Sequence, residues 1–323
     1  MTVRWGILGC GDIARKRVAQ AILDDPGSEL VAVCRRDSAK LKVFCENFGI
    51  ERSYRSEVKL IEDAEIDAVY IATPVYLHHP QTLAAAAAGK HVLVEKPMAM
   101  SATECDEMVA ACLGAGVKLG VAYYRRFYPL MVRTEQLLAE ERIGRVMAVR
   151  AVANTPFEIA PGEDGYFRAI LSEGGGGALM DIGSHRLNLM LHLFGQATDV
   201  KACCTTVAAQ YEAEDTATLS MRFSSGVHGS LQCFFGQRPT LDSFEVIGAQ
   251  GRILCDPLNG DQLRIETPEE TIVETHKRDE NSHLPLITDF VAAINDDRPP
   301  RVTGEEGRMA SEVMQRAYED SLW

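Results

Sequence analysis

The sequence lacks the features that mark membrane proteins, nucleic-acid-binding proteins and disulfide-stabilised secreted proteins. No apolar run approaches the roughly 20 residues that a membrane-spanning helix needs, so we expect no membrane partner. Acidic residues (46) outnumber lysine and arginine (33), and the formal net charge is −13. This balance argues against a nucleic-acid partner, which would need a basic face.

Metal-binding and disulfide patterns are also missing. None of the nine cysteines forms a Cys-x-x-Cys pair, and most lie in apolar segments, where cysteine behaves as a small buried hydrophobe. The pattern favours a reducing, cytoplasmic location and no bound metal. Strand-like residues begin at Val3, so we expect no signal or transit peptide ahead of the first strand.

What the sequence does contain is enough material for two domains, since 323 residues are many for one hydrophobic core. In the first 120 residues, short apolar runs alternate with amphipathic stretches. The predicted strands are residues 3–8, 30–34, 68–72, 91–94 and 118–122, and the predicted helices are 13–23, 40–48, 81–88 and 103–113. Alternation at this spacing predicts a doubly wound parallel sheet of the α/β class.

From about residue 144 the pattern changes to longer strands that follow one another without helices. These are residues 146–153, 200–207, 216–223, 229–235 and 244–248. They predict a mostly antiparallel sheet with one covered face, in an α+β domain. One helix, residues 179–194, interrupts them after a run of four glycines, and two more are expected at 286–294 and 305–322.

A dinucleotide-binding fingerprint follows the first strand and opens the first helix, in the sequence Gly9-Cys10-Gly11-Asp12-Ile13-Ala14. The two glycines permit a tight turn and close approach of the backbone to a pyrophosphate. The small third position lets helix and strand pack, and the helix N-terminus supplies N–H donors. We therefore assign cofactor binding to Gly9, Gly11, Asp12, Ile13 and Ala14.

The end of the second strand predicts which nicotinamide cofactor is preferred. Arg35 occupies the deciding position, Arg36 follows it, and Ser38 lies nearby. Two guanidinium groups and a hydroxyl suit a 2′-phosphate, so we favour NADP. A shift of register would instead place Asp37 on the ribose, which leaves NAD open as the cofactor. A further alternative is that Arg35 and Arg36 belong to a solvated turn and bind no cofactor.

Glu95-Lys96-Pro97 ends the apolar run 91–94, which places an ammonium group at the carboxyl edge of the sheet, where ligands bind in open α/β folds. The alternative is a surface loop with a solvated lysine. Thr73-Pro74 ends the preceding strand and is positioned to touch the cofactor. His78 and His79 follow it. Adjacent histidines diverge on a helix, so we expect capping or site-lining roles for them rather than metal binding.

Asp181 and His185 lie four residues apart in the helix after the glycine run, hence on one helix face, and Asn188 follows one turn on. The alternative is an exposed intrahelical pair. Because an imidazole titrates near neutrality, His185 can take an alcohol proton while hydride leaves the same carbon.

Taken together, these residues resemble the Gfo/Idh/MocA (glucose–fructose oxidoreductase/inositol dehydrogenase/rhizopine catabolism) oxidoreductase family, essentially from end to end. The motifs that carry the resemblance are Gly9-x-Gly11-x-x-Ala14, Ala72-Thr73-Pro74 with His78, Ala88-Gly89-Lys90-His91-Val92, Glu95-Lys96-Pro97, Arg125-Arg126-Phe127 with Pro129, the glycines 174–177, Asp181-x-Gly183-x-His185, and Gly304-Glu305-Glu306-Gly307.

The resemblance implies an NAD(P)-binding Rossmann domain at residues 1–122 and a substrate-binding and oligomerisation domain at 123–323, whose C-terminal helix can pack back on the first domain. It also implies homodimers or homotetramers. Substrate would lie between Lys96 and the helix of Asp181 and His185. Lys96 would hydrogen-bond the reacting hydroxyl, His185 would be the acid/base, and Asp181 would orient substrate or His185.

The remaining site residues also come from the resemblance. It adds His78, Glu95, Lys96 and Arg125 to the cofactor site, and it places Tyr124, Tyr166, Arg168, Asp181, His185 and Asn188 on the substrate side. Asn188 replaces an aspartate usual in many members, and an asparagine common near Arg125 is absent. The replacement at Asn188 leaves sugar or inositol specificity open.

The function we predict is an NAD(P)-dependent dehydrogenase or reductase acting on CH–OH groups, with NADP preferred and a carbohydrate-like small molecule, a sugar, cyclitol or related diol, as substrate. Two alternatives keep the fold: a nicotinamide-dependent glycoside hydrolase that works through a transient oxidation, and a catalytically silent nucleotide sensor. The intact Lys96, Asp181 and His185 argue against the sensor.

Overall fold

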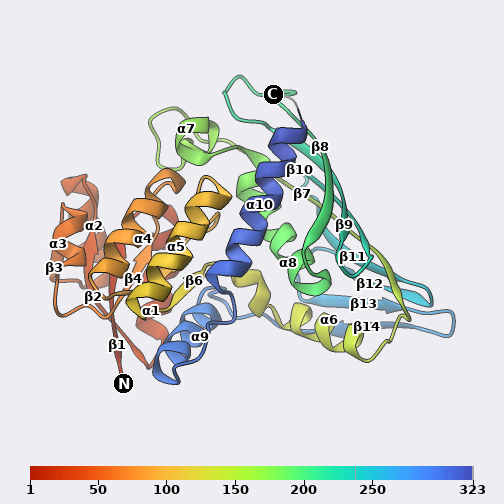
Figure 1. Cartoon of the computed structure of the whole chain (residues 1–323), viewed down its shortest axis with the longest axis horizontal. Helices are drawn as coiled ribbons and strands as arrows, with labels where there is room; N and C mark the ends of the chain where they lie inside the picture. Colours follow the sequence, from red (N-terminus) through yellow and green to blue (C-terminus); the bar gives the residue numbers. More distant parts are fainter. Residues whose placement is uncertain (237, 322–323) are drawn as a thin grey trace. The chain divides into compact units, whose positions relative to one another are not determined.

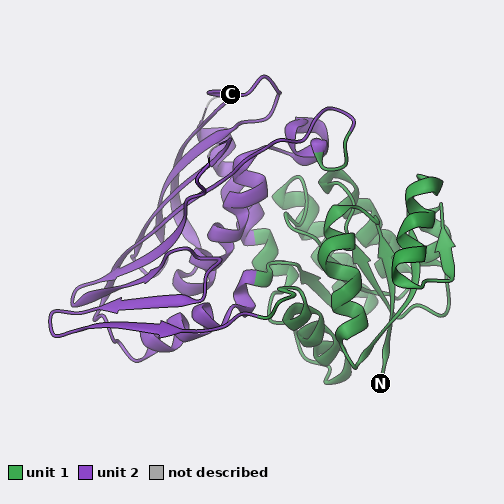
Figure 2. Ribbon diagram, turned by 180° about the vertical axis from the view of Figure 1, so that it is seen from behind, with its two compact units in different colours: residues 1–124, 163–165, 279–308 green, residues 125–162, 166–278, 309–323 purple. Residues whose placement is uncertain are grey.

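The computed structural model describes residues 1–236 and 238–321, which form two compact units (Figure 1). Unit 1 consists of residues 1–124, 163–165 and 279–308, and unit 2 of residues 125–162, 166–278 and the described residues from 309 onward (Figure 2). The chain therefore enters unit 1 three times. Leu322, at the end of the last predicted helix, lies outside the described residues.

Unit 1 is built on a six-stranded parallel sheet in the order β3-β2-β1-β4-β5-β6. Its strands are β1 (Val3–Leu8), β2 (Ser28–Cys34), β3 (Arg52–Tyr54), β4 (Ala68–Ile71), β5 (His91–Val94) and β6 (Leu119–Val121). The order of strands reverses between β1 and β4, which is where an open α/β sheet binds its ligand. The predicted doubly wound sheet is confirmed.

Helices cover both faces of this sheet. Trp5 of β1 packs against Phe290 of α9 (Leu284–Asn295), with ring centroids 5.7 Å apart. A Cβ on the next residue, Gly6, would lie 2.8 Å from Leu60 of α3 (Glu57–Ile61). Since successive strand residues point to opposite faces, α3 and α9 lie on opposite sides of β1. The other helices are η1 (Ala14–Val18), α1 (Ala19–Asp24), α2 (Ser38–Phe48), η2 (Val75–Leu77), α4 (His78–Ala87) and α5 (Ala102–Ala115).

Helix α10 (Gly304–Asp320) begins in unit 1 and continues in unit 2. Its start approaches β6 so closely that a Cβ on Gly307 would lie 2.5 Å from Val121. Arg308 donates from Nε to Asp106 of α5 over 2.8 Å. The glycine and the ion pair fix the first turn of α10 within unit 1.

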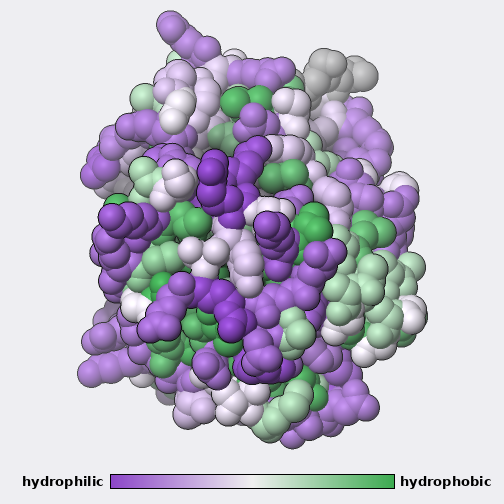
Figure 3. All heavy atoms as spheres, turned by 90° about the vertical axis from the view of Figure 1, so that its left-hand side faces the viewer, coloured by the Kyte–Doolittle hydropathy of each residue, from purple (hydrophilic) through white to green (hydrophobic). Residues whose placement is uncertain are grey.

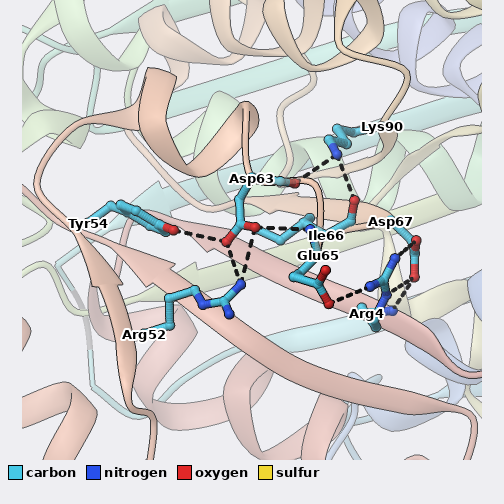
Figure 4. A network of polar contacts seen from close by, with 8 residues as sticks. All are labelled: Arg4, Arg52, Tyr54, Asp63, Glu65, Ile66, Asp67 and Lys90. Carbon is cyan, nitrogen blue, oxygen red and sulfur yellow. Dashed lines mark hydrogen bonds and ion pairs between the residues drawn. The ribbon is translucent and has the colours of Figure 1, made fainter.

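A network of ion pairs and hydrogen bonds closes the amino edge of the parallel sheet (Figure 4). Arg4 contacts Asp67 through Nε (3.0 Å) and Nη2 (2.8 Å). Lys90, just before β5, donates to the carbonyls of Asp63 (2.9 Å) and Ile66 (2.8 Å). The network also includes Arg52 and Glu65, and the Tyr54 hydroxyl reaches Asp63 from the carboxyl end of β3. Each of these charges therefore has a partner within the edge itself.

The side of unit 1 formed by α2 and α3 is mostly hydrophilic, with scattered apolar residues (Figure 3). Val43 on α2 and Val58 on α3 are both more than half exposed. Single exposed apolar side chains of this kind are normal on a solvent-facing surface and need no partner.

Unit 2 is built on an eight-stranded sheet in the order β14-β13-β12-β11-β7-β10-β9-β8. Its strands are β7 (Val146–Thr155), β8 (Ala197–Thr205), β9 (Thr216–Phe223), β10 (His228–Phe235), β11 (Asp242–Gly248), β12 (Gly251–Cys255), β13 (Gln262–Glu266) and β14 (Thr271–Thr275). Only the β7–β10 pair is parallel, so the predicted mostly antiparallel sheet is confirmed.

One face of this sheet is covered and the other is exposed. In β9, Ala217, Leu219, Met221 and Phe223 are buried while the residues between them are exposed or half-buried. Against β10 lie a π-helical turn, η5 (Leu179–Gly183), and α8 (Ser184–Phe194), which together form the helix predicted at 179–194. The other helices are η3 (Tyr124–Phe127), α6 (Pro129–Ala139), η4 (Tyr166–Ala169) and α7 (Leu171–Gly174).

Some elements have weak sequence patterns and were not predicted. Strand β3 is a three-residue edge strand, Arg-Ser-Tyr, with no apolar alternation. Strand β14 is an edge strand of the eight-stranded sheet, and none of its residues is buried. Helix α6 begins with Pro129 at its first position, which is a helix start signal that the prediction did not use. Among the described residues, no helix combines the length and apolarity needed to cross a membrane.

Candidate active site

The fingerprint loop has the geometry that a bound pyrophosphate requires. Gly9 adopts φ +92°, and a Cβ there would lie 2.6 Å from the carbonyl oxygen of Ala72, so only glycine fits. A Cβ on Gly11 would meet no atom within 4 Å. Glycine at position 11 is therefore not needed for packing, and it leaves the backbone open to a ligand. Ala14 is fully buried at the start of η1, as predicted for the third position.

The side chains of the loop itself serve the first helix. Asp12 pairs with Arg15 (2.8 Å) and Lys16 (2.6 Å), and its carboxyl pKa is lowered: burial opposes this shift, and the two cations outweigh it. Ile13 is half-buried at the helix start. The contribution of these two positions to a cofactor site would come from their backbone N–H groups.

Arg35 directly follows β2, as the sequence analysis placed it. Its backbone N–H donates to the backbone carbonyl of Tyr54 (3.1 Å), and its Nη1 donates to the carbonyl of Cys10 in the fingerprint loop. The side chain is 15% exposed, which excludes a freely solvated arginine. Arg36 and Ser38 are exposed beside it. Asp37 is the N-cap of α2, and its Oδ1 accepts hydrogen bonds from the N–H groups of Ala39 and Lys40, both over 3.0 Å.

Two further charged residues meet at Arg35 and were missed by the sequence analysis. Asp164 lies 2.8 Å from Arg35 Nη2 through Oδ2, and Lys40 Nζ lies 2.9 Å from Asp164 Oδ1. Lys40 could have been found, because it belongs to the first turn of a predicted helix. Asp164 is 129 residues away in the chain, and no local pattern points to it.

His78 joins the ends of two neighbouring strands. Its ring is buried, with Nε2 2.8 Å from the carbonyl of Thr73 and Nδ1 3.0 Å from the carbonyl of Pro97. Burial lowers its pKa, so the ring is neutral near pH 7 and donates only one of these two hydrogen bonds. Thr73 Oγ1 donates to Gln81 (2.7 Å), and Pro74 precedes η2. These residues shape the carboxyl edge at β4 and β5.

The Glu95-Lys96-Pro97 motif follows β5 and contains a cis Lys96–Pro97 peptide bond. From Val92 to Ala99 every residue is buried except Lys96, which is half-buried. A solvated surface loop is therefore excluded. The motif presents one lysine from an otherwise buried segment at the carboxyl edge of the sheet.

A buried carboxylate network lies under Lys96. Glu95 accepts a hydrogen bond from the Tyr70 hydroxyl (2.7 Å) and from the N–H of Lys96 (3.1 Å). The Nε2 of His283 lies 3.5 Å from Glu95 Oε1. Burial alone would raise the pKa of Glu95, but His283, Lys96 and Tyr70 reverse the effect and hold it below its usual value. His283 is a second residue that the sequence analysis missed, and its ring packs on Tyr124 with centroids 4.7 Å apart.

In unit 2, the glycine run brings backbone segments into close contact around a buried carboxylate. A Cβ on Gly177 would lie 1.9 Å from the carbonyl oxygen of Glu214. The Glu214 carboxylate accepts hydrogen bonds from the N–H groups of Gly177 (2.6 Å) and Leu179 (2.8 Å) and from the Tyr318 hydroxyl (2.9 Å). Burial raises its pKa. Glu214 caps the start of the histidine helix, a role that the sequence analysis missed.

The predicted polar face of that helix is buried rather than exposed. His185 and Asn188 are 4% and 1% exposed, so the exposed intrahelical pair is excluded. Asp181, in the π-helical turn, receives Nε of Arg168 at 3.1 Å. Arg168 and Tyr166 both come from η4, so the structure brings Arg168 to the helix, as expected for the substrate side. Tyr166 lies near Phe157, with ring centroids 6.4 Å apart.

Arg125 is also held within unit 2. It is 8% exposed, and its Nε donates to Asn259 Oδ1 over 3.2 Å. The hydroxyl of Tyr128 donates to the same oxygen over 3.2 Å. Across residues 1–236 and 238–321, no group of three or more His, Cys, Asp or Glu side chains is placed to hold a metal ion. Each of the nine cysteines carries a free thiol.

Known proteins match the chain over nearly its whole length. Residues 3–123 match the family described as oxidoreductase family, NAD-binding Rossmann fold, and residues 131–254 match the GFO/IDH/MocA C-terminal domain. A 1,5-anhydro-D-fructose reductase of Ensifer adhaerens is 32% identical over 315 residues, covering 94% of this chain and 92% of that protein.

Two further matches cover almost all of both proteins. D-xylose 1-dehydrogenase (NADP(+)) 2 of Haloferax volcanii is 29% identical and covers 98% of this chain and 97% of its own. The crystal structure of an aldose–aldose oxidoreductase from Caulobacter crescentus, complexed with glycerol, superposes with a TM-score of 0.90 at 28% identity. It covers 99% of this chain and 98% of that chain.

Proposed function

The chain belongs to the GFO/IDH/MocA family of oxidoreductases with an NAD-binding Rossmann domain, and on this premise we propose that it prefers NADP and acts on a sugar, cyclitol or related diol. It is an enzyme of the dehydrogenase and reductase class. The proposed reaction moves a hydride between the nicotinamide and a carbon that carries a hydroxyl or carbonyl group.

The observation that carries the proposal is the exposure of Lys96 at the carboxyl edge of β5, the same edge at which Gly9 and Gly11 follow β1. In a parallel sheet the carboxyl ends of all strands meet at one edge. The open backbone at Gly11 and the half-buried Lys96 therefore belong to one ligand-binding edge of unit 1.

Each proposed catalytic residue has one task. The nicotinamide, when bound, accepts or supplies the hydride. The Lys96 ammonium group donates a hydrogen bond to the reacting oxygen and stabilises negative charge on it as its proton leaves. The His185 imidazole accepts that proton during oxidation and returns it during reduction. Asp181 and Arg168, paired at 3.1 Å, orient the substrate hydroxyls, with Tyr166 and Asn188 beside them.

The preference for NADP rests on the cations at the end of β2. Arg35 donates to the carbonyl of Cys10 and pairs with Asp164, and Lys40 pairs with the same carboxylate. Arg36 and Ser38 are exposed beside them. A guanidinium and an ammonium group suit a phosphate dianion. The Haloferax volcanii relative, which the match covers over 97% of its length, has NADP(+) in its name.

Replacing Arg35 with aspartate tests that preference. The loss of charge-assisted hydrogen bonds, worth about 1.5–3 kcal/mol, should lower NADPH affinity about 10- to 100-fold, with NADH affinity retained. The matched control is Lys42→Ala, which removes an exposed cation from α2, the helix that follows Arg35 in the chain. An unchanged ratio of NADPH to NADH affinity in Arg35→Asp would remove Arg35 from the cofactor site.

The reaction itself is tested by nicotinamide absorbance with NADP or NAD and a panel of sugars, cyclitols and aryl diols. In His185→Ala, turnover should fall about 10²–10⁴-fold with nucleotide affinity retained. His192→Ala, two turns further along α8 and paired with Glu135, is the control and should stay near the wild-type rate. Nucleotide binding without turnover on any substrate would favour the hydrolase or the sensor, and tightly held NAD in the purified protein would favour the hydrolase.

We also propose that the chain forms homodimers or homotetramers and works in a reducing cytoplasm. The exposed face of the eight-stranded sheet offers surface for self-association, and the free thiols suit a reducing compartment. Sedimentation equilibrium should give two or four times the monomer mass of 35.5 kDa. A monomer at micromolar concentration would refute the assembly.

A further inference from the structure

The guanidinium group that we assign to a 2′-phosphate already has an anionic partner within unit 1. Both carboxylate oxygens of Asp164 lie within hydrogen-bonding distance of Arg35 Nη2, at 2.8 and 3.0 Å. Lys40 Nζ donates to Asp164 Oδ1 over 2.9 Å. The Asp164 carboxylate thus pairs with two of the cations that would bind a 2′-phosphate.

Asp164 and Lys40 are 43% and 50% exposed, as in an ordinary surface ion pair, and Arg35 is the member of the cluster that differs. Surface pairs contribute little because two flexible side chains must be held in one geometry. Here Arg35 is only 15% exposed and is already held by the carbonyl of Cys10. Partial burial would raise the pKa of Asp164, but its bonds to Arg35 and Lys40 outweigh that effect and lower it. Asp164 is therefore a carboxylate anion near neutral pH.

The backbone on either side of Asp164 turns sharply and places the residue in unit 1, beside Arg35. Residues 163–165 belong to unit 1, whereas the residues on either side of them belong to unit 2. Gly162 and Gly165 flank the acid with φ +86° and +99°, a backbone region that favours glycine. A Cβ on Gly162 would meet nothing within 4 Å, so glycine is required there by the turn and not by crowding.

We propose that Asp164 is a specificity-determining residue that competes with the cofactor's 2′-phosphate for Arg35 and Lys40. The inference rests on the proposed nicotinamide function. A nucleotide without a 2′-phosphate leaves the Asp164–Arg35 pair in place. A nucleotide with one must displace the carboxylate, which it can do because a phosphate carries about −1.5 to −2 charges near neutral pH against one for Asp164. Asp164 therefore lowers the ratio of NADP affinity to NAD affinity below the value that Arg35 and Lys40 alone would give.

The test removes the charge and keeps the shape. Asp164→Asn should raise NADPH affinity about 5- to 30-fold, the range that one to two kcal/mol corresponds to, and change NADH affinity less than about twofold. Glu163→Gln is the matched control, because it removes the neighbouring negative charge from the same turn. If E163Q reproduces the effect of D164N, the cause is long-range charge and the proposal is wrong.

A double-mutant cycle separates direct competition from a general change in the site. In the Arg35→Ala background, D164N should no longer raise NADPH affinity, because the two residues act through one contact. A D164N protein whose NADPH and NADH affinities change equally, or not at all, overturns the proposal. So does an effect of D164N that persists in full without Arg35.

The outcomes also distinguish this inference from the proposed function. A wild-type protein that prefers NADH, with D164N gaining NADPH affinity, contradicts the NADP preference and supports the role of Asp164. A wild-type protein that prefers NADPH, with D164N unchanged, supports the preference and contradicts the role of Asp164. Failure of both wild type and D164N to bind either nucleotide overturns both.

Discussion

The two edges of the parallel sheet in unit 1 contain the same kinds of charged side chain in opposite circumstances. At the amino edge, Arg4 and Lys90 have acceptors in the same network, as Figure 4 shows. At the carboxyl edge, Arg35 pairs with Asp164 and the Cys10 carbonyl, and Lys96 is half-buried, beside a backbone left open at Gly11. The comparison teaches that the same kinds of charge meet different surroundings at the two edges, because the carboxyl edge of an open α/β sheet is the one that binds ligands.

The two lysines around β5 show the contrast within one short segment. Lys90 precedes the strand and is 9% exposed, with its ammonium group on two backbone carbonyls. Lys96 follows the strand and is the one half-buried residue of a buried stretch. We expect substitution of the first to affect stability and substitution of the second to affect chemistry.

The largest expected effect comes from exchanging each of these lysines for methionine. Lys96→Met should lower turnover about 10²–10³-fold, because it removes a hydrogen-bond donor to the developing oxyanion. Lys90→Met should leave the rate per folded molecule near wild type and lower the free energy of unfolding by about 1–3 kcal/mol, because two buried carbonyls lose their donor. Steady-state rates and urea unfolding measure both. Equal rate losses in the two variants would contradict the comparison.

A smaller effect should separate the two glycines of the fingerprint loop. Gly9→Ala forces a Cβ against the carbonyl of Ala72 at a positive φ, so it should destabilise the fold by about 1–3 kcal/mol. Gly11→Ala enters open space, so the free energy of unfolding should stay within about 0.5 kcal/mol of wild type. Its nucleotide affinity should nevertheless fall. Thermal unfolding and nucleotide titration give the two readouts, and unimpaired binding by G11A would argue against a pyrophosphate at this loop.

At the amino edge, Asp67→Asn should cost about 1 kcal/mol of unfolding free energy, since the carboxylate accepts charge-assisted hydrogen bonds from Arg4. Turnover per folded molecule should not change, because the residue lies at the edge opposite the fingerprint loop. Glu29→Gln, an exposed acid on β2, is the control for loss of charge alone. A rate defect in D67N without a stability defect would be the contrary result.

The smallest expected effect is the pH dependence of the contribution that Asp67 makes to the free energy of unfolding. The Arg4 hydrogen bond lowers the pKa of Asp67 in the folded protein below its unfolded value of about 3.9. A lowered folded-state pKa means that the stabilisation is full above the unfolded pKa and is lost as pH falls through the folded one. The stability difference between wild type and D67N should therefore shrink below about pH 4. A difference that stays constant from pH 6 to pH 3 would exclude this linkage.

Local patterns predicted the fold well where strands are buried and helices amphipathic. Strands β1 and β5 have the predicted bounds, because each is a short, mostly apolar run with clear ends. The edge strand β3 was missed, because a short strand of polar residues is held by backbone pairing and leaves no hydrophobic pattern. Strand β14 was missed because its two apolar residues, Ile272 and Val273, are adjacent and do not alternate with polar ones.

The site shows the same division between local and distant information. Gly9, Arg35 and Lys96 could be placed because each stands at the end of a recognisable strand. Asp164, Glu214 and His283 could not, because each acts on a residue that is distant in sequence: 129 residues separate Asp164 from Arg35, and 37 separate Glu214 from Gly177. Such pairings depend on how the chain returns, which no short window of sequence records.

The threefold entry of the chain into unit 1 has a consequence for biosynthesis. A ribosome releases β1 to β6 first, but Phe290, which packs on Trp5, and His283, which lies beside Glu95, emerge more than 150 residues after β6. Domains normally fold from the N-terminus while synthesis continues. The residues that complete unit 1 are synthesised only when nearly the whole polypeptide has been made, so a nascent chain truncated before residue 279 lacks the Phe290 side chain that packs on Trp5.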